Sequence, residues 1–181
     1  PMLRNSPERY GLVTKLFHWS IAFSILGLIW LGWEMVDLTY YDPWYHKSLS
    51  LHRVLGLAVL AVAIAMLLWQ RVSRPPALPS SIPRAQQIAA HAVHHTLFLM
   101  MLLLPVTGYL ISTSAGQAIP VYGLFEVPAL VQVDEKIRDL VIAIHYYCAY
   151  GTGLLAAVHA AAALKHQFID RDGVLARMIW R

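Results

Sequence analysis

Charged residues are scarce in this sequence of 181 residues, at 13%, whereas apolar residues make up 58%. Soluble domains have roughly 25% charged and 45–50% apolar residues. The composition therefore excludes a disordered chain, a nucleic-acid-binding protein and a water-soluble enzyme. The single cysteine, Cys148, excludes an internal disulfide bond. Long uncharged apolar stretches occur instead, and they predict a protein that crosses a membrane several times.

These stretches predict an all-α fold, a single domain over residues 1–181 with four transmembrane helices at about residues 14–36, 52–71, 86–112 and 140–165. Each stretch is long enough for a tilted helix to span the bilayer. Pro105 and Gly108 predict a kink in the third helix. Several prolines between residues 74 and 83 exclude a helix there and predict a loop.

The distribution of lysine and arginine predicts the orientation of the bundle. Of the 14 basic residues, all but Lys47, Arg53, Lys136 and Arg138 lie on the side that holds both ends and the loop at 71–84. Cytoplasmic loops carry the excess of positive charge, so we expect both termini to be cytoplasmic. On the outer side, the second loop is long, and its stretch 127–137 predicts a helix lying along the membrane surface.

Nine histidines are present, and several fall within the predicted spans. Ionisable residues inside a membrane are candidates for function by default. His145 and His159 are fourteen residues apart in the fourth span, so they share one face of a helix and lie about 21 Å apart along its axis. By depth in the membrane, His52 matches His145 near the outer surface, and His18 matches His159 near the inner surface.

Two imidazoles at each depth predict two iron sites, each a haem held by one histidine on either side. Such a site has no open axial position, so it transfers electrons and does not bind oxygen. No Cys-x-x-Cys-His motif occurs, which predicts non-covalent, b-type haem. A lone membrane histidine more often forms an interhelical hydrogen bond, and zinc is the competing metal. Zinc sites use clustered ligands, however, with cysteine or carboxylate nearby.

At the inner end of the third span, His91, His94 and His95 leave alternatives open. One of them could replace an inner iron ligand. Together they could instead line a quinone site, because a quinone needs hydrogen-bond donors at its carbonyl groups and a path for protons from water. The third possibility is that they only solvate the end of the helix.

The four outer cations, Lys47, Arg53, Lys136 and Arg138, also allow two interpretations. Their positive potential could attract a small anion such as superoxide towards the outer iron site. Alternatively, they contact lipid phosphate or form salt bridges with Asp134, Glu135 and Asp139 in the same loops.

Taken together, these residues resemble the bacterial cytochrome b561 family of four-helix, dihaem membrane proteins, which includes the superoxide oxidase. The resemblance covers nearly the whole chain. It rests on Arg9-Tyr10-Gly11, Leu16-Phe17-His18-Trp19, Tyr41-Asp42-Pro43-Trp44-Tyr45, Leu51-His52-Arg53, His91-x-x-His94, Leu104-Pro105-Val106-Thr107-Gly108, His145, the run from His159 to His166, and Arg177-Met178.

The resemblance implies two b-type haems with His18, His52, His145 and His159 as axial ligands, placed in the bacterial inner membrane and in contact with lipid. It also implies exchange of electrons with ubiquinone. We therefore expect an oxidoreductase that oxidises periplasmic superoxide to oxygen and reduces ubiquinone. The alternative is a quinol-linked electron-transfer cytochrome b that serves a periplasmic redox partner protein and has no superoxide activity.

Overall fold

The computed structural model describes residues 2–179 and is mostly helical. Its elements are α1 (Leu12–Val36), α2 (Tyr45–Val72), α3 (Arg84–Thr113), the strands β1 (Ile119–Val121) and β2 (Phe125–Val127), α4 (Glu135–Lys165), the π-helical turn η1 (His166–Asp170) and α5 (Val174–Ile179). Four of the helices are long and apolar enough to cross a membrane. Each predicted span lies within one of these helices; residues 1, 180 and 181 of the predicted domain lie outside the described residues.

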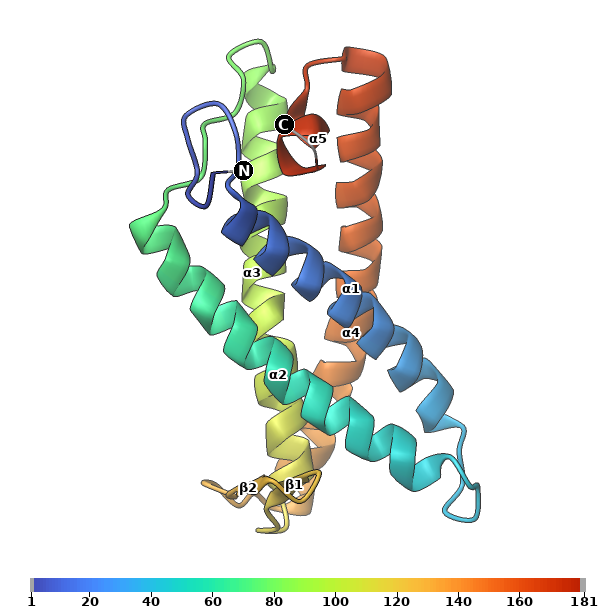
Figure 1. Ribbon diagram of the computed structural model, residues 1–181. Helices are drawn as coiled ribbons and strands as arrows, with labels where there is room; N and C mark the ends of the chain where they lie inside the picture. The colour runs from blue at the N-terminus through green and yellow to red at the C-terminus, as the bar shows by residue number, and fades with distance from the viewer. Residues whose placement is uncertain (1, 180–181) are drawn as a thin grey trace.

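The long helices form two antiparallel pairs, α1 with α2 and α3 with α4, and the first pair crosses the second (Figure 1). α2 also packs along α3, whereas α1 and α4 contact each other little. Both ends of the described chain lie at the same end of the bundle as the loop between α2 and α3 (Figure 1). The loop between α1 and α2 lies at the opposite end, together with the two strands (Figure 1). We call this the outer end and the other the inner end, after the orientation predicted from the basic residues.

Hydrogen bonds tie the chain ends to the loop between α2 and α3. The backbone N–H of Asn5 donates to Ser73 Oγ at 2.9 Å, and Arg177 Nη1 donates to the carbonyl oxygen of Ala77 at 2.8 Å. Trp19 on α1 donates from Nε1 to the carbonyl oxygen of Met178 at 3.3 Å. These bonds hold α5 across the end of the bundle where the histidine-rich part of α3 also lies.

A small apolar core lies inside the bundle. Its buried members are Ile21, Ala63, Met66 and Met101, from α1, α2 and α3. Large apolar side chains elsewhere point outward, such as Phe23, 67% exposed, and Leu154, 71% exposed. So much apolar surface on long helices would be unfavourable in water, so these faces contact lipid.

The outer loop between α3 and α4 differs from the prediction of an entirely helical fold. β1 and β2 form an antiparallel hairpin in which Ile119 lies opposite Val127. The hairpin turns through Tyr122 and Gly123, whose φ angles are 47° and 75°. Positive φ at both central residues is the geometry of a tight hairpin turn, for which glycine is favoured.

The prediction of a surface helix over 127–137 is wrong. Between Val127 and Glu135 the chain has no helix. Tyr109 on α3 holds this segment in place, since its hydroxyl donates to the carbonyl oxygen of Pro128 at 2.7 Å and accepts from the N–H of Leu130 at 2.8 Å. Asp134 then caps α4 by accepting a hydrogen bond from the N–H of Ile137 at 2.8 Å, so the helix begins only at the following residue.

Candidate cofactor sites

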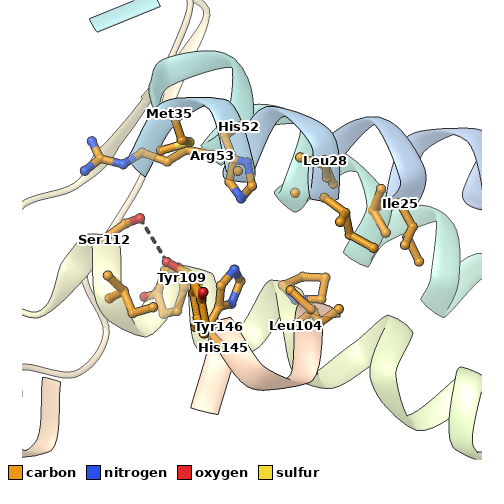
Figure 2. A pocket seen from close by; sticks show the side chains of 18 of the residues that line it. Ile25, Leu28, Met35, His52, Arg53, Leu104, Tyr109, Ser112, His145 and Tyr146 are labelled. Atoms are coloured by element: carbon orange, nitrogen blue, oxygen red, sulfur yellow. Dashed lines mark hydrogen bonds between the residues drawn. The ribbon is translucent and has the colours of Figure 1, made fainter. Parts of the chain in front are cut away.

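A cavity of about 370 Å³ lies at the outer end of the bundle, between the α1–α2 pair and the α3–α4 pair. Its lining is mainly apolar and includes His52 from α2 and His145 from α4. The two rings face each other across the cavity (Figure 2). A mainly apolar cavity with a few convergent polar groups is the usual form of a cofactor site, and the volume lies in the usual range of roughly 300–1,000 Å³.

The spacing of these two rings matches a single metal ion held between them. The ring centroids of His52 and His145 are 6.3 Å apart, with an interplanar angle of 65°. A metal–imidazole bond is about 2 Å long and a ring nitrogen lies about 1 Å from its centroid, so two imidazoles on opposite sides of one metal have centroids about 6 Å apart. The outer pair therefore has the separation that bis-histidine ligation requires.

Two glycines on neighbouring helices set the position of these rings. A Cβ atom added to Gly32 of α1 would lie 3.3 Å from Cε1 and 3.8 Å from Nδ1 of His52. A Cβ atom added to Gly108 of α3 would lie at the same two distances from His145. Each ring thus turns its Nδ1 side towards a neighbouring helix, which leaves Nε2 as the nitrogen available to a metal.

Thr107 on α3 fixes the tautomer of His145. Its hydroxyl lies 2.8 Å from His145 Nδ1 and 2.9 Å from each of the carbonyl oxygens of Leu103 and Leu104. The single hydroxyl hydrogen donates to these carbonyl oxygens, so Oγ1 accepts a hydrogen bond from Nδ1–H. This arrangement keeps the Nε2 lone pair free, as is usual for a histidine that binds a metal. This role of Thr107 was not predicted from the sequence.

A second pair of histidines lies at the inner end of the bundle. His18 on α1 and His159 on α4 also have ring centroids 6.3 Å apart, with an interplanar angle of 51°. His18 Nδ1 is buried and has no hydrogen-bond partner within residues 2–179. The inner pair thus repeats the separation of the outer pair, on the same helix α4 and in the predicted combination.

Of the three histidines at the inner end of α3, the structure brings one to this site. His94 contacts His159 with ring centroids 5.2 Å apart, which is closer than ligation on opposite sides of one metal allows. His91 and His95 are exposed, and His95 Nδ1 donates to the carbonyl oxygen of His91 at 2.6 Å. His94 therefore lies beside the inner pair, whereas His91 and His95 point elsewhere.

The four outer cations differ in their surroundings. Arg53 belongs to the lining of the outer cavity, which does not include Lys47, Lys136 or Arg138. Arg138 forms an ion pair with Asp139 at 3.1 Å, which is one of the salt bridges considered above. Lys47 and Lys136 are exposed, and no ion pair within residues 2–179 involves either of them.

A cluster of His166, Asp170 and Asp172 closes the inner end of α4. The possible ligand atoms of these three side chains all lie within 4.8 Å of one another, and no other such group of three occurs in the described part of the chain. His166 Nδ1 pairs with Asp172, and Lys165 pairs with Asp170. Because Lys165 and His166 already bind the carboxylates, this cluster closes the helix end as a local charge network.

Four long apolar helices and two pairs of histidine rings 6.3 Å apart are the features expected of a membrane protein that binds a metal-containing cofactor. A sequence model of the family described as prokaryotic cytochrome b561 matches residues 9–181. The chain belongs to this family, whose proteins bind b-type haem and transfer electrons in membranes.

Three relatives match over almost their whole length. "Cytochrome b561 homolog 2" of Escherichia coli (strain K12) is 41% identical, over 97% of this chain and 93% of that protein. "Probable superoxide oxidase CybB" of Yersinia pestis is 27% identical, over 95% and 96%. "Cytochrome b561 homolog 1" of Escherichia coli (strain K12) is 28% identical, over 96% and 98%.

The residues of this chain fit a b-type haem. The outer cavity holds no cysteine or carboxylate among its lining residues, and its two imidazoles face each other at the separation that one metal between them requires. Glycine at positions 32 and 108 gives the ligand rings their space. The Nδ1 atoms of His18 and His52 are buried and have no hydrogen-bond partner within residues 2–179, so these two rings lack the supporting hydrogen bond that Thr107 gives His145.

Proposed function

We propose that this protein transfers electrons between the outer face of the bacterial inner membrane and ubiquinone through two b-type haems. His52 and His145 would hold the outer haem, and His18 and His159 the inner one. A haem bound there would supply a one-electron redox centre, and these imidazoles would hold it. The observation that carries this proposal is the equal separation of 6.3 Å in the two histidine pairs.

The charge distribution supports an orientation with both termini in the cytoplasm. The described ends of the chain and the basic loop between α2 and α3 share one end of the bundle (Figure 1), and the positive-inside rule assigns such an end to the cytoplasm. His52 and His145 then lie near the periplasm. The whole chain, residues 1–181, would form one transmembrane cytochrome b domain.

α4 would set the distance that electrons cross. It carries His145 and His159 on one face, about 21 Å apart along the axis at about 1.5 Å per residue. Ile21, Met66 and Met101 form a buried apolar cluster between α1, α2 and α3.

We propose superoxide as the electron donor at the outer end. Two superoxide anions would be oxidised to two molecules of oxygen, and one ubiquinone would take up the two electrons and two protons to form ubiquinol. The name of the relative from Yersinia pestis supports this donor. Lys47, Arg53 and Lys136 supply positive charge at the outer end, which raises the local concentration of a small anion; Arg138 contributes less because Asp139 neutralises it.

Ubiquinone would be reduced near the inner end, where His91, His94 and His95 lie on α3. His94 contacts His159 and can donate a hydrogen bond to a quinone carbonyl group. His91 and His95 are exposed and can take protons from the cytoplasm. The two protons used in each turnover would therefore enter from the cytoplasmic side.

The second candidate is a quinol-linked cytochrome b that serves a periplasmic redox protein without superoxide activity. The outer hairpin favours it, because Tyr122 at 63% and Leu124 at 81% expose apolar surface beyond the cavity. Exposed apolar patches often mark contact sites for proteins. The name of the relative at 41% identity specifies no electron donor.

The deciding experiment mixes purified, haem-loaded protein with a superoxide flux and ubiquinone. Haem reduction and ubiquinol are followed together by absorbance. We expect fast haem reduction and one ubiquinol for every two superoxide anions. Haems that ubiquinol reduces but superoxide leaves oxidised would rule out the oxidase and favour the partner-dependent cytochrome. A preparation with fewer than two haems per chain would overturn the dihaem assignment itself.

A further inference from the structure

Arg53 is a charged residue in an apolar cavity with no acidic neighbour in the lining. Its Nε atom is buried and has no hydrogen-bond partner within residues 2–179. No aspartate or glutamate is among the residues that line this cavity. Burying part of a guanidinium without an anion is costly, and proteins compensate for such a charge by pairing it. An anionic group is therefore expected beside Arg53, and the described residues that line the cavity do not supply one.

We propose that Arg53 binds a propionate carboxylate of the outer haem, so that it is a cofactor-binding residue. This inference rests on the proposed haem between His52 and His145. A b-type haem carries two propionate groups on one edge of its ring. Arginine suits this partner because its planar fork of N–H groups binds a carboxylate through two parallel hydrogen bonds.

The placement of Arg53 agrees with this role. It follows the proposed ligand His52 directly in α2, so the haem iron and the guanidinium are anchored by the same turn of helix. In Figure 2, Arg53 extends beside Met35, away from Leu28 and Ile25, which lie deeper in the bundle. The propionate bound by Arg53 would accordingly lie towards the outer end of the cavity.

This assignment divides the outer cations by task. The charge of Arg53 is neutralised by the propionate, so the attraction of superoxide at long range falls to the exposed Lys47 and Lys136. Substitutions at Arg53 should then change how tightly the outer haem is held. Substitutions at the two lysines should change only the rate at which an anion arrives.

The test measures haem loss, independently of electron-transfer activity. Purified Arg53→Gln and Arg53→Lys variants are mixed with excess apomyoglobin, and the transfer of haem is followed by absorbance. Arg138→Gln is the matched control, since Arg138 lies outside the cavity lining and pairs with Asp139. We expect Arg53→Gln to lose the outer haem roughly 10- to 100-fold faster than the unaltered protein, with Arg53→Lys between them. Arg138→Gln should lose it at the unaltered rate.

Haem with esterified propionates separates the ion pair from a general packing defect. In the unaltered protein, the dimethyl ester should leave the outer site as fast as native haem leaves Arg53→Gln. In Arg53→Gln, ester and native haem should leave at the same rate. The inner haem of each variant should be lost at the unaltered rate, which shows that the bundle is intact.

Two results would overturn the inference in different ways. Equal loss of native haem from Arg53→Gln and the unaltered protein, with both haems present, would refute the role of Arg53 alone. A His52→Ala variant that keeps as many haems as the unaltered protein would refute the outer haem itself, and the role of Arg53 with it.

Discussion

Removing the Thr107 hydroxyl tests whether the hydrogen bond to His145 holds the outer cofactor site together. Thr107 Oγ1 lies 2.8 Å from His145 Nδ1. Thr107→Val keeps the shape of the side chain and removes the hydroxyl, so Nδ1–H loses its side-chain acceptor. Since Thr107 is 6% exposed, water cannot readily replace the lost hydroxyl.

The expected effect follows from the cost of a buried donor that has lost its acceptor. This cost is about 1–3 kcal/mol, and a tenfold change in affinity corresponds to about 1.4 kcal/mol. We therefore expect the affinity for the outer haem to fall roughly 5- to 150-fold, in line with the roughly 10- to 100-fold effects of such supporting residues at metal sites. The outer haem should also become easier to reduce, because an imidazole that has lost this hydrogen bond is a weaker base and stabilises ferric iron less.

Thr113→Val provides the matched control on the same helix. Thr113 is fully buried, and its hydroxyl donates to the carbonyl oxygen of Tyr109 at 2.9 Å without contacting a histidine. Haem transfer to apomyoglobin and a redox titration are measured for both variants. Equal haem loss and equal potentials in Thr107→Val and Thr113→Val would refute the reasoning, because the effect would then belong to any buried threonine of α3.

Three further predictions concern the two histidine pairs and the outer surface. Gly32→Ala should weaken binding of the outer haem, because the added Cβ would lie 3.3 Å from His52 Cε1. Gly27→Ala is the control, since its added Cβ would have no atom within 4 Å. Haem content after detergent washing distinguishes the two variants, and equal retention would contradict the packing role of Gly32. His159→Ala should lose one haem per chain and His94→Ala none, as measured from the pyridine haemochrome spectrum; loss of a haem from His94→Ala would reassign the inner ligand. Stopped-flow rates of reduction by superoxide should fall as salt is added, because ions screen the exposed outer lysines, and a rate independent of salt would argue against electrostatic attraction.

The helices could be predicted because a membrane requires long uncharged stretches, and the sequence shows where charges interrupt them. The relation between His145 and His159 could also be predicted, since the rise and rotation of an α-helix set the relation between two of its residues. The match of His52 and His18 to them in depth followed from where each span begins and ends. The family was predicted from motifs that surround these positions, and the family comparison confirms it.

The supporting contacts could not be predicted, because they depend on how the helices cross. Gly32 lies on a different helix from His52, next to its ring. Several other glycines occur in the spans, and nothing in the sequence distinguishes Gly32 from them. Thr107 lies in a motif of the family, yet its contact with His145 requires α3 and α4 to pack in one particular register. Arg53 could not be separated from Lys47, because both are cations near the start of α2 and only the packing of α2 places one of them in the cavity.

α4 has a part in both proposed sites, and this explains why α1 and α4 contact each other so little. Each proposed site takes one histidine from α4 and the other from the α1–α2 pair, so a bound cofactor would lie where direct helix contact would otherwise occur. The outer cavity of about 370 Å³ has a mainly apolar lining drawn from all four long helices, and a flat apolar cofactor there would supply contacts that these helices do not make with each other. We therefore expect binding of the proposed cofactors to be coupled to the docking of the α1–α2 pair against α4.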